Sequence, residues 1–540
     1  MASVAPGSTQ VLIAGGGPVG LATAIELGRR DVDCLVVEPR VTVSRARPRC
    51  KTVNVRTLEH LRRWGIAERL RERAPLPVSW SKDIVFCTSL TGHELSRFTG
   101  VLGLAADGDR FAETGQQAPQ YVLEELLRDV ADELPTVSLA RGYRVLGLEQ
   151  DEGEVRVAIA AEGGEESMVS ADFVVGCDGA RSVVRAAIGS DYVGEHALRP
   201  NLGMVFRAPA LLERVRHGPA VQYWIVNRSA PGLMGPIDLQ GTWWMIAFGV
   251  DCESGERDAQ QIIEGCAGEP VEAAVVSTDG WTARMQLVDS ARRGRVFLAG
   301  DAAHLNPPFG GHGLNTGVGD SVDLGWKLAA VLKGWGGPGL LDSYELERRP
   351  VQTQVIEAAA ANNRVLAADL LADEIDAEGA AGERARRAAD ANIQDTKNAE
   401  FHALDLVLDL AYDGSPIISA NGSSPDPVTG GRDGAVVGAR LPHAWLAPGQ
   451  SLFDALGDGM SLLVLAEDRG RDVESLAAAA RSRGVPLRVI GLEGRDLRPR
   501  YGSDLVLVRP DQHVAWRADH APAEPARLID RVRGMDRGTP

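Results

Sequence analysis

A strand–turn–helix pattern near the start of the chain restricts its fold more than any other feature. The apolar run 11–14 has the character of a buried strand, and Gly15, Gly17 and Gly20 follow it with G-x-G-x-x-G spacing before a helix at 21–29. The first glycine permits a tight turn, the second lets phosphate approach the backbone, and the third permits close helix–strand packing. This pattern predicts a dinucleotide-binding unit. The turn residues expected to contact the nucleotide are Gly15, Gly17, Pro18, Val19 and Gly20.

A second apolar run at 34–37 ends at Glu38, about 20 residues after the glycine turn. An acidic residue at this place accepts hydrogen bonds from ribose hydroxyls in dinucleotide-binding units. We therefore expect Glu38, with its neighbours Pro39 and Arg40, at the nucleotide. A glycine turn that binds no ligand is the alternative, and the pattern alone leaves FAD and NAD open.

A second glycine-rich block lies far downstream. An apolar strand at 296–299 ends at Gly300 and Asp301, and a Pro-Pro pair precedes three further glycines. The Asp301 carboxylate suits hydrogen bonds from hydroxyl groups, with capping of the next helix as the alternative. The prolines fix a rigid loop, and the glycines let bare backbone amides lie against a flat ring. The residues of this block expected at a cofactor are Asp301, Pro308, Gly311, Gly313, Leu314 and Asn315.

Length, charge and cysteine usage limit the class of protein. A chain of 540 residues is long for one core, so we expect three or so domains. The net charge of −17 argues against nucleic acid or an anionic membrane surface as a partner. The sequence has no stretch of about 18 apolar residues and no signal-peptide pattern, so we expect a cytoplasmic protein without a membrane span. Six scattered cysteines without a C-x-x-C pair predict neither a disulfide nor a metal site.

The order of expected elements indicates an α/β fold of several domains. A strand-rich, aromatic-rich region near 190–285 interrupts the nucleotide-binding domain, and a Pro/Gly/Ser-rich linker near 414–440 precedes a further α/β unit. One amphipathic helix is expected at 56–71, and another helix at 118–133. The expected domains are 1–75, 105–185 and 286–400 for the nucleotide, 76–104 and 186–285 for the substrate, and 401–540 at the C-terminus. Strands of the last unit are expected at 461–466, 487–490, 503–509 and 513–517.

Three ordered blocks resemble the signature blocks of the class A flavoprotein aromatic hydroxylases. They are the glycine turn 15–20, the Asp178-Gly179 block 178–185, and the late block 300–315. The resemblance covers essentially the whole chain. It is closest to phenol- and chlorophenol-hydroxylase-like and aromatic-polyketide-hydroxylase-like enzymes, a branch supported by Arg-Thr-Leu-Glu at 56–59 and by the segment 508–517.

The resemblance implies a Rossmann-like FAD-binding domain, an inserted β-sheet substrate domain and a thioredoxin-like C-terminal domain. It implies FAD as cofactor and NADPH or NADH with dioxygen as co-substrates. No second G-x-G-x-x-G unit is present, so a separate NADPH domain is not expected. No cysteine follows Cys266, which excludes thiol redox chemistry in the C-terminal unit. The late loop would face the pyrimidine end of the flavin, and the family usually has Gln where this chain has His312. Further cofactor contacts implied by the family are Arg49, Gln120, Asp178 and Gly179.

The implied reaction is hydroxylation of a phenolic or polycyclic aromatic ring through a flavin C4a-hydroperoxide in a water-poor pocket. The catalytic base stays unknown, because some phenol hydroxylases carry an Asp five residues before the Arg of Arg-Thr-Leu-Glu, where this chain has Lys51. Aromatic residues of the sheet are candidates for the pocket wall, although aromatic residues in a sheet more often belong to its core. The pocket candidates are Tyr223, Trp224, Trp243, Arg207 and Pro308, with Trp244 beside them.

Three other functions are alternatives to hydroxylation. A Baeyer–Villiger-type or decarboxylating oxygenation of an aromatic polyketide would use the same scaffold. A flavin-dependent halogenase is disfavoured, because Trp243-Trp244-Met-Ile-Ala lacks the spacing and the proline of the W-x-W-x-I-P element. A non-catalytic flavoprotein that binds an aromatic ligand is the alternative of another class. The substrate, the ring position, the nicotinamide preference and the oligomeric state stay open, a homodimer being one option.

Overall fold

The computed structural model describes residues 7–46, 51–161, 163–419 and 434–536. Its first sheet has the order β16-β17-β10-β1-β2-β7, in which β17, β10, β1, β2 and β7 run parallel. Such a sheet with a helix after its first strand is the arrangement that the glycine pattern predicts. The strands are β1 (Ser8–Ala14), β2 (Cys34–Glu38), β7 (Val137–Arg141), β10 (Glu166–Gly176), β16 (Arg292–Arg293) and β17 (Val296–Leu298).

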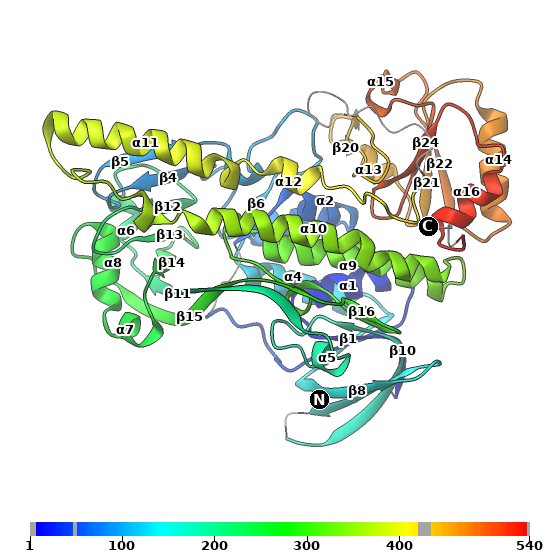
Figure 1. Ribbon diagram of the computed structural model, residues 1–540, viewed down its shortest axis with the longest axis horizontal. Coiled ribbons are helices and arrows are strands. Elements are labelled where there is room, and N and C mark those ends of the chain that lie inside the picture. The colour runs from blue at the N-terminus through cyan, green and yellow to red at the C-terminus, as the bar shows by residue number, and fades with distance from the viewer. Residues whose placement is uncertain (1–6, 47–50, 162, 420–433, 537–540) are drawn as a thin grey trace.

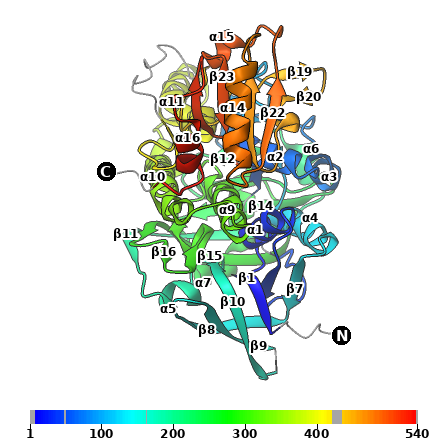
Figure 2. The same ribbon diagram turned by 90° about the vertical axis from the view of Figure 1, so that its right-hand side faces the viewer.

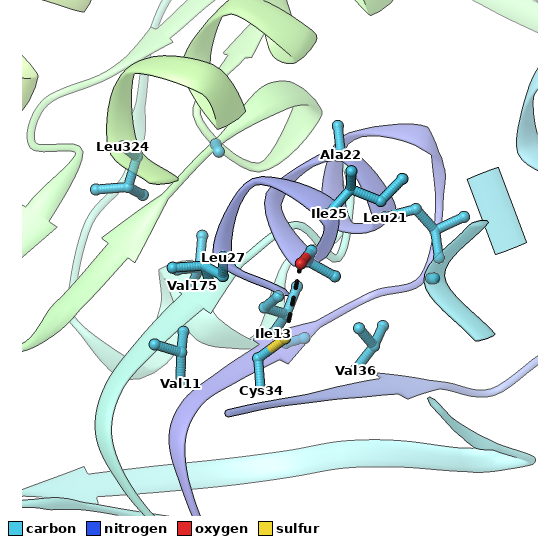
Figure 3. Packing of buried hydrophobic residues seen from close by; sticks show 14 of the residues in the cluster. Val11, Ile13, Leu21, Ala22, Ile25, Leu27, Cys34, Val36, Val175 and Leu324 are labelled. Carbon is cyan, nitrogen blue, oxygen red and sulfur yellow. Dashed lines mark hydrogen bonds between the residues drawn. The ribbon is translucent and has the colours of Figure 1, made fainter. Parts of the chain in front are cut away.

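The core of this domain lies between the sheet and α1 (Pro18–Gly28). Val11 and Ile13 of β1 are fully buried, as expected for parallel strands covered on both faces. Figure 3 shows their side chains beneath α1, where the Cys34 thiol contacts the Ala24 carbonyl oxygen at 3.9 Å. α4 (Gln120–Glu133) and α9 (His312–Leu332) contact α1 from either side. An antiparallel hairpin of β8 (Tyr143–Gln150) and β9 (Val155–Ala161) extends the sheet at the bottom of Figure 2.

A second sheet has the order β18-β15-β11-β14-β13-β12-β4-β5. It unites the two segments that the sequence assigned to one inserted sheet, and the parallel pairing of β4 with β12 joins them. The edge strand β18, which is the last of these strands along the chain, belongs to the late glycine-rich block. This block therefore contacts both sheets. The strands are β4 (Ile84–Cys87), β5 (Glu94–Phe98), β11 (Tyr192–Arg207), β12 (Gln222–Ile225), β13 (Gly232–Pro236), β14 (Thr242–Phe248), β15 (Ala274–Val288) and β18 (His304–Leu305).

Helices cover the sheets and join the domains. α10 (Pro338–Arg364) crosses the middle of the molecule in Figure 1, and α11 (Gly379–Phe401) packs against β5 of the second sheet. The predicted segment 286–400 therefore ends on the substrate sheet rather than on the nucleotide domain. The remaining short elements are β3 (Thr52–Val53), β6 (Gln116–Gln117), α5 (Val183–Ala187), α6 (Leu211–Arg214), α7 (Cys252–Arg257), α8 (Ala259–Ala267) and α12 (Leu404–Leu408).

The amphipathic helix expected at 56–71 is two helices, α2 (Val55–Arg63) and α3 (Ala67–Arg73). Gly65 interrupts it with a φ of +78°, a conformation that glycine adopts without strain. Leu58, Leu61 and Ile66 of this segment are nevertheless all buried in the core of the domain.

The C-terminal residues form a four-stranded sheet with the order β22-β21-β23-β24, close to the four strands expected. Its core is continuous with α9 and α10, because Trp326 and Leu340 pack with Leu462 and Trp516. This unit lies at the top of Figure 2. Its elements are β19 (Trp445–Ala447), β20 (Gln450–Ser451), α13 (Leu452–Ala455), β21 (Met460–Val464), α14 (Gly470–Arg481), β22 (Leu487–Gly491), α15 (Arg498–Tyr501), β23 (Leu505–Val508), β24 (Val514–Ala518) and α16 (Pro525–Val532).

None of the helices in the described residues has both the length and the apolar character that crossing a membrane requires. The same residues contain no group of three or more His, Cys, Asp or Glu side chains arranged to hold a metal ion.

Candidate functional site

The three glycines of the early turn have different structural roles. Gly15 has a φ of +98°, and a Cβ there would lie 2.4 Å from the Cys177 carbonyl oxygen. A Cβ at Gly20 would lie 1.9 Å from the Gly15 carbonyl oxygen, so both glycines are required by the packing of the protein itself. Gly17 precedes Pro18 at the start of α1, and a Cβ there would meet no described protein atom within 4 Å. The protein leaves this side of the helix N-terminus open, where an anionic phosphate is favoured.

Glu38 ends β2 and lies beside this turn. Its Oε2 accepts a hydrogen bond from the Gly16 amide at 2.7 Å, and its Oε1 accepts from the Arg40 amide and guanidinium at 2.9 and 2.7 Å. Arg40 in turn pairs with Glu124 of α4 at 2.9 Å. These contacts fix the carboxylate at the edge of the turn. Oε2 accepts only one of these hydrogen bonds and keeps a second lone pair, so the ribose role predicted for Glu38 is compatible with them.

The early turn and the late block meet in space. A Cβ at Gly300 would lie 2.9 Å from Cγ2 of Val19, and one at Gly317 in α9 would lie 2.6 Å from the same atom. Ser321 of α9 donates to the Val19 carbonyl oxygen at 2.8 Å. Thus α1 and α9 pack closely only because glycines face Val19. The two motifs, nearly three hundred residues apart, form one site.

A buried aspartate on α9 holds the start of the late block in place. Asp320 Oδ2 accepts from the Gly300 amide at 3.1 Å and contacts His304 Nε2 at 2.9 Å, while Oδ1 accepts from Arg348 Nε at 2.8 Å. Burial alone would raise the pKa of Asp320, but Arg348 and His304 lower it to about 2. Sequence reasoning missed this residue, and the available signal was an aspartate that lies between the apolar residues Val318 and Val322 inside a helix.

Asp178 and Gly179 follow β10 at the edge of the same site. Asp178 Oδ2 accepts from the amides of Val183 and Val184 at 2.7 and 3.2 Å, which caps α5. Its Oδ1 is buried and has no hydrogen-bond partner among the described residues. Gly179 has a φ of +79°, and a Cβ there would meet nothing within 4 Å. The helix cap therefore uses one carboxylate oxygen and leaves the other for a ligand.

Asp301 is an exposed residue in a short 3₁₀ turn (Gly300–Ala302) at the start of the late block. Its carbonyl oxygen accepts a hydrogen bond from Tyr192 Oη, and the Arg185 guanidinium lies 4.0 Å above the Tyr192 ring. Gln120 is half-buried at the first position of α4. Arg49, the arginine assigned to phosphate and nicotinamide, lies outside the described residues.

The loop after Pro307 turns into α9 on two left-handed glycines. Gly310 and Gly311 have φ values of +81° and +68°, and Gly311 caps the helix. The side-chain nitrogen Nδ2 of Asn315 donates to the carbonyl oxygens of Gly311 and Thr52 at 2.6 and 2.9 Å. These bonds hold the first turn of α9 rigidly against β3. The remaining loop residues of the prediction are Pro308, which is exposed, Gly313, and the half-buried Leu314.

α11 supports the same loop from the substrate side. Glu400 binds the Gly310 amide and accepts from Lys397 Nζ at 2.8 Å, and burial raises the pKa of this carboxyl. The Lys397 ammonium lies 4.5 Å from the Trp224 ring centroid. Through these two residues α11 joins the loop to the second sheet.

Strand alternation separates the aromatic candidates onto two faces of the second sheet. Trp224 packs with Phe248 and with Phe309 of the late loop, whose ring centroids lie 5.9 and 6.1 Å away. Trp244 belongs to the same cluster and is partly exposed. Trp224 itself is fully buried, so it supports this face from beneath.

Tyr223 and Trp243 lie on the face of the sheet opposite to Trp224 and Phe309, so the structure does not bring them together with the other aromatic candidates. Both are fully buried in the opposite cluster with Ile263 of α8, because neighbouring residues of a strand point to opposite faces. Tyr223 Oη is also occupied, since it donates to Gly218 and accepts from the Ala220 amide. Arg207 is exposed at the end of β11.

Comparison with known proteins agrees with this geometry. Residues 8–359 match the family model described as an FAD binding domain, and residues 434–535 match the aromatic-ring hydroxylase C-terminal model. An FAD-dependent monooxygenase of Emericella nidulans is 31% identical, with 99% of this chain and 91% of the relative covered. The 2,4-dichlorophenol 6-monooxygenase of Delftia acidovorans is 31% identical, covering 94% and 95%. The solved structure of RebC with bound 7-carboxy-K252c is 36% identical with a TM-score of 0.90, covering 98% and 100%.

The chain belongs to the FAD-dependent aromatic-ring hydroxylases. It is therefore a flavoprotein monooxygenase of the branch that contains phenol and polyketide hydroxylases.

The residues of this hydroxylase fit FAD. The open side of Gly17 and the positive end of α1 suit the pyrophosphate, and Glu38 suits the adenosine ribose. The unpartnered Oδ1 of Asp178 is an acceptor for a hydroxyl or for an ordered water at the ligand. The N-terminus of α9 can stabilise negative charge on the ring of a bound flavin.

Proposed function

We propose that this hydroxylase transfers one atom of dioxygen to an electron-rich phenolic or polycyclic aromatic ring, with NADPH or NADH as the electron donor. The other oxygen atom leaves as water. Bound FAD would supply the oxidation of the nicotinamide and the activation of dioxygen. The observation that carries the proposal is that the loop of the late glycine-rich block contacts the aromatic face of the second sheet. Phe309 of that loop lies 6.1 Å from Trp224 and 6.0 Å from Phe248, measured between ring centroids.

The residues of the chain supply position and exclusion of water. Trp244 and Ile246 are partly buried and lie on the same face as Trp224, where they offer apolar surface to a flat ring. Asn315 and Glu400 fix the loop that faces this surface. A rigid loop and an apolar wall would hold the reacting carbon at one orientation and keep water from the oxygen-transfer step. The 2,4-dichlorophenol relative supports a phenolic substrate class.

The C-terminal unit is proposed to be the thioredoxin-like appendage of this family, with a structural role. It has a central mixed sheet, in which β22 pairs parallel with β21 while β23 and β24 pair antiparallel. The chain has no cysteine after Cys266, so a disulfide reaction in this unit is excluded. Its core packs on Trp326 of α9. This contact supports a role in holding α9, the helix that begins at the loop of the late block. A homodimer and a role for Arg49 at the phosphate and nicotinamide remain proposals.

Purified protein tests the proposed reaction directly. We expect a yellow protein that oxidises NADPH or NADH faster when phenols, naphthoquinones or polycyclic polyketides are added. With ¹⁸O₂, the product should gain one labelled oxygen atom, as mass spectrometry measures. A labelled product with a broken ring or lost carbon dioxide would favour a Baeyer–Villiger-type or decarboxylating oxygenation. Ligand binding without any change in flavin reduction would favour a non-catalytic flavoprotein.

A further inference from the structure

Lys51 is a partly buried cation on the substrate side of the site. Its Nζ donates to the Val221 carbonyl oxygen at 3.0 Å and lies 5.3 Å from the Trp244 ring centroid. An ammonium group has three donors, so the Val221 contact leaves two. No carboxylate of the described residues pairs with Lys51, and burial alone lowers its pKa to about 7.

The backbone around Lys51 keeps its side chain on the aromatic face. Its carbonyl oxygen accepts from the Ala118 amide at 2.7 Å, and the next residue, Thr52, pairs with Gln117 between β3 and β6. The side chain then crosses to the second sheet, where Val221 and Trp244 receive it. Lys51 therefore bridges the two domains at the edge of the surface proposed for the aromatic ring.

An unpaired ammonium in such a place is costly. Burial of a charge without a partner is expensive, and the face of a tryptophan compensates only part of that cost. The other lysine on this face, Lys397, has Glu400 as its partner at 2.8 Å. An anionic oxygen of a bound ligand would complete the coordination of Lys51 in the same way.

We propose that the Lys51 ammonium binds the acidic oxygen of the aromatic substrate and stabilises its phenolate form. The inference rests on the proposed function and names the group that recognises the substrate. Ionisation breaks the phenol O–H bond, and the proton goes to water or, when Lys51 is neutral, to its amine. No electrons are transferred in this step.

The test uses FAD-loaded protein and a chromogenic pair, 4-nitrophenol and 4-nitroanisole. The anisole has the same ring but no ionisable oxygen. Difference spectra against ligand-free holoenzyme measure the ionisation of bound nitrophenol from pH 5 to 8. In the wild-type protein, we expect the pKa of the bound phenol to fall by at least one unit, which is a tenfold preference for phenolate. Lys51→Met should lose this shift, and Lys51→Arg should retain most of it.

Controls separate a local effect from misfolding. Lys51→Met should keep its FAD content and its affinity for 4-nitroanisole, and Lys82→Met, at an exposed lysine, should behave like the wild type. The proposal is overturned if wild-type protein shows no preference for nitrophenolate or if Lys51→Met keeps it. The readout needs no turnover. If the protein ionises the phenol but never oxygenates it, this result contradicts only the proposed function.

Discussion

Arg509 of the C-terminal unit directs two nitrogens at Glu347 of α10, with Nη1–Oε1 and Nη2–Oε2 distances of 2.6 and 2.8 Å. Both side chains are fully buried. Asp323 and Lys327 of α9 and Asp511 complete the cluster. Burial and the nearby carboxylates raise the pKa of Asp323 above its ordinary value, while Lys327 and Arg509 oppose this shift. This pair joins the C-terminal unit to the helices of the FAD-binding domain.

Replacing Arg509 with methionine should destabilise the protein by about 3–5 kcal/mol, because Glu347 and Asp511 would remain buried with too little positive charge. Urea unfolding at pH 7 measures the change. Arg527→Met is the matched control, since Arg527 is exposed and should change stability by under about 0.5 kcal/mol. Equal unfolding midpoints for the wild-type and Arg509→Met proteins would contradict this role.

Replacing Gly17 with alanine should reduce FAD affinity at least tenfold without loss of stability. The new Cβ would meet no described protein atom but would project into the space assigned to the pyrophosphate. Flavin content after dialysis and thermal unfolding of the apoprotein measure the two effects. Gly147→Ala in β8 is the control, because its Cβ also meets nothing within 4 Å, far from the site. Full retention of FAD by Gly17→Ala would refute the placement.

Acid stability should report the buried state of His312. Burial lowers its pKa from 6.5 to about 4, and its Nε2 has no hydrogen-bond partner among the described residues. Between pH 6.5 and 4 the unfolded chain binds a proton that the folded chain does not, so stability falls as pH falls. From pH 7 to 5, His312→Gln should lose about 2 kcal/mol less than the wild type. Urea titrations at both pH values test this, and parallel losses would count against it.

Lys51 should make the binding of a permanent aromatic anion depend on pH. Its folded-state pKa of about 7 lies below the ordinary 10.5, so the ammonium is fully present only below pH 7. The affinity for naphthalene-2-sulfonate should therefore fall by up to tenfold per pH unit from pH 7 upward, until the pKa of Lys51 in the complex is reached. Titration of the flavin spectrum between pH 6 and 10 measures this. The same slope in Lys51→Met would assign it to another group.

The same pKa shift has a consequence for stability. Above pH 7 the unfolded chain keeps a proton on Lys51 that the folded chain releases, so the cost of burying the charge decreases from pH 7 toward 10.5. Lys51→Met should be more stable than the wild type at pH 6.5, and the difference should shrink by pH 9. Thermal unfolding of the two proteins at these pH values gives the comparison. A constant difference would show that Lys51 keeps its proton in the folded protein over this range, so that its pKa is not lowered.

Local patterns predicted the elements whose residues specify them without help from elsewhere. The G-x-G-x-x-G turn identified the start of α1, since Gly15 and Gly20 are fixed by contacts within that motif and its neighbouring strand. The C-terminal hairpin was expected at 503–517 and occurs as β23 and β24. The break at Gly65 was missed, because apolar spacing continues on both sides of a glycine whose positive φ depends on tertiary packing.

The sequence by itself determined the glycine turn, the positions of several strands along the chain and the family, because these depend on residue type and spacing along the chain. It also placed Asn315 and Asp301 in one block with Gly311. Only the tertiary structure decided which partners meet. Tyr223 and Trp224 are neighbours that face opposite sides of one sheet, and the sequence does not say which side meets the flavin loop. The contacts of Asp320, Glu400 and Lys51 arise between distant segments, where burial and charge are set by packing.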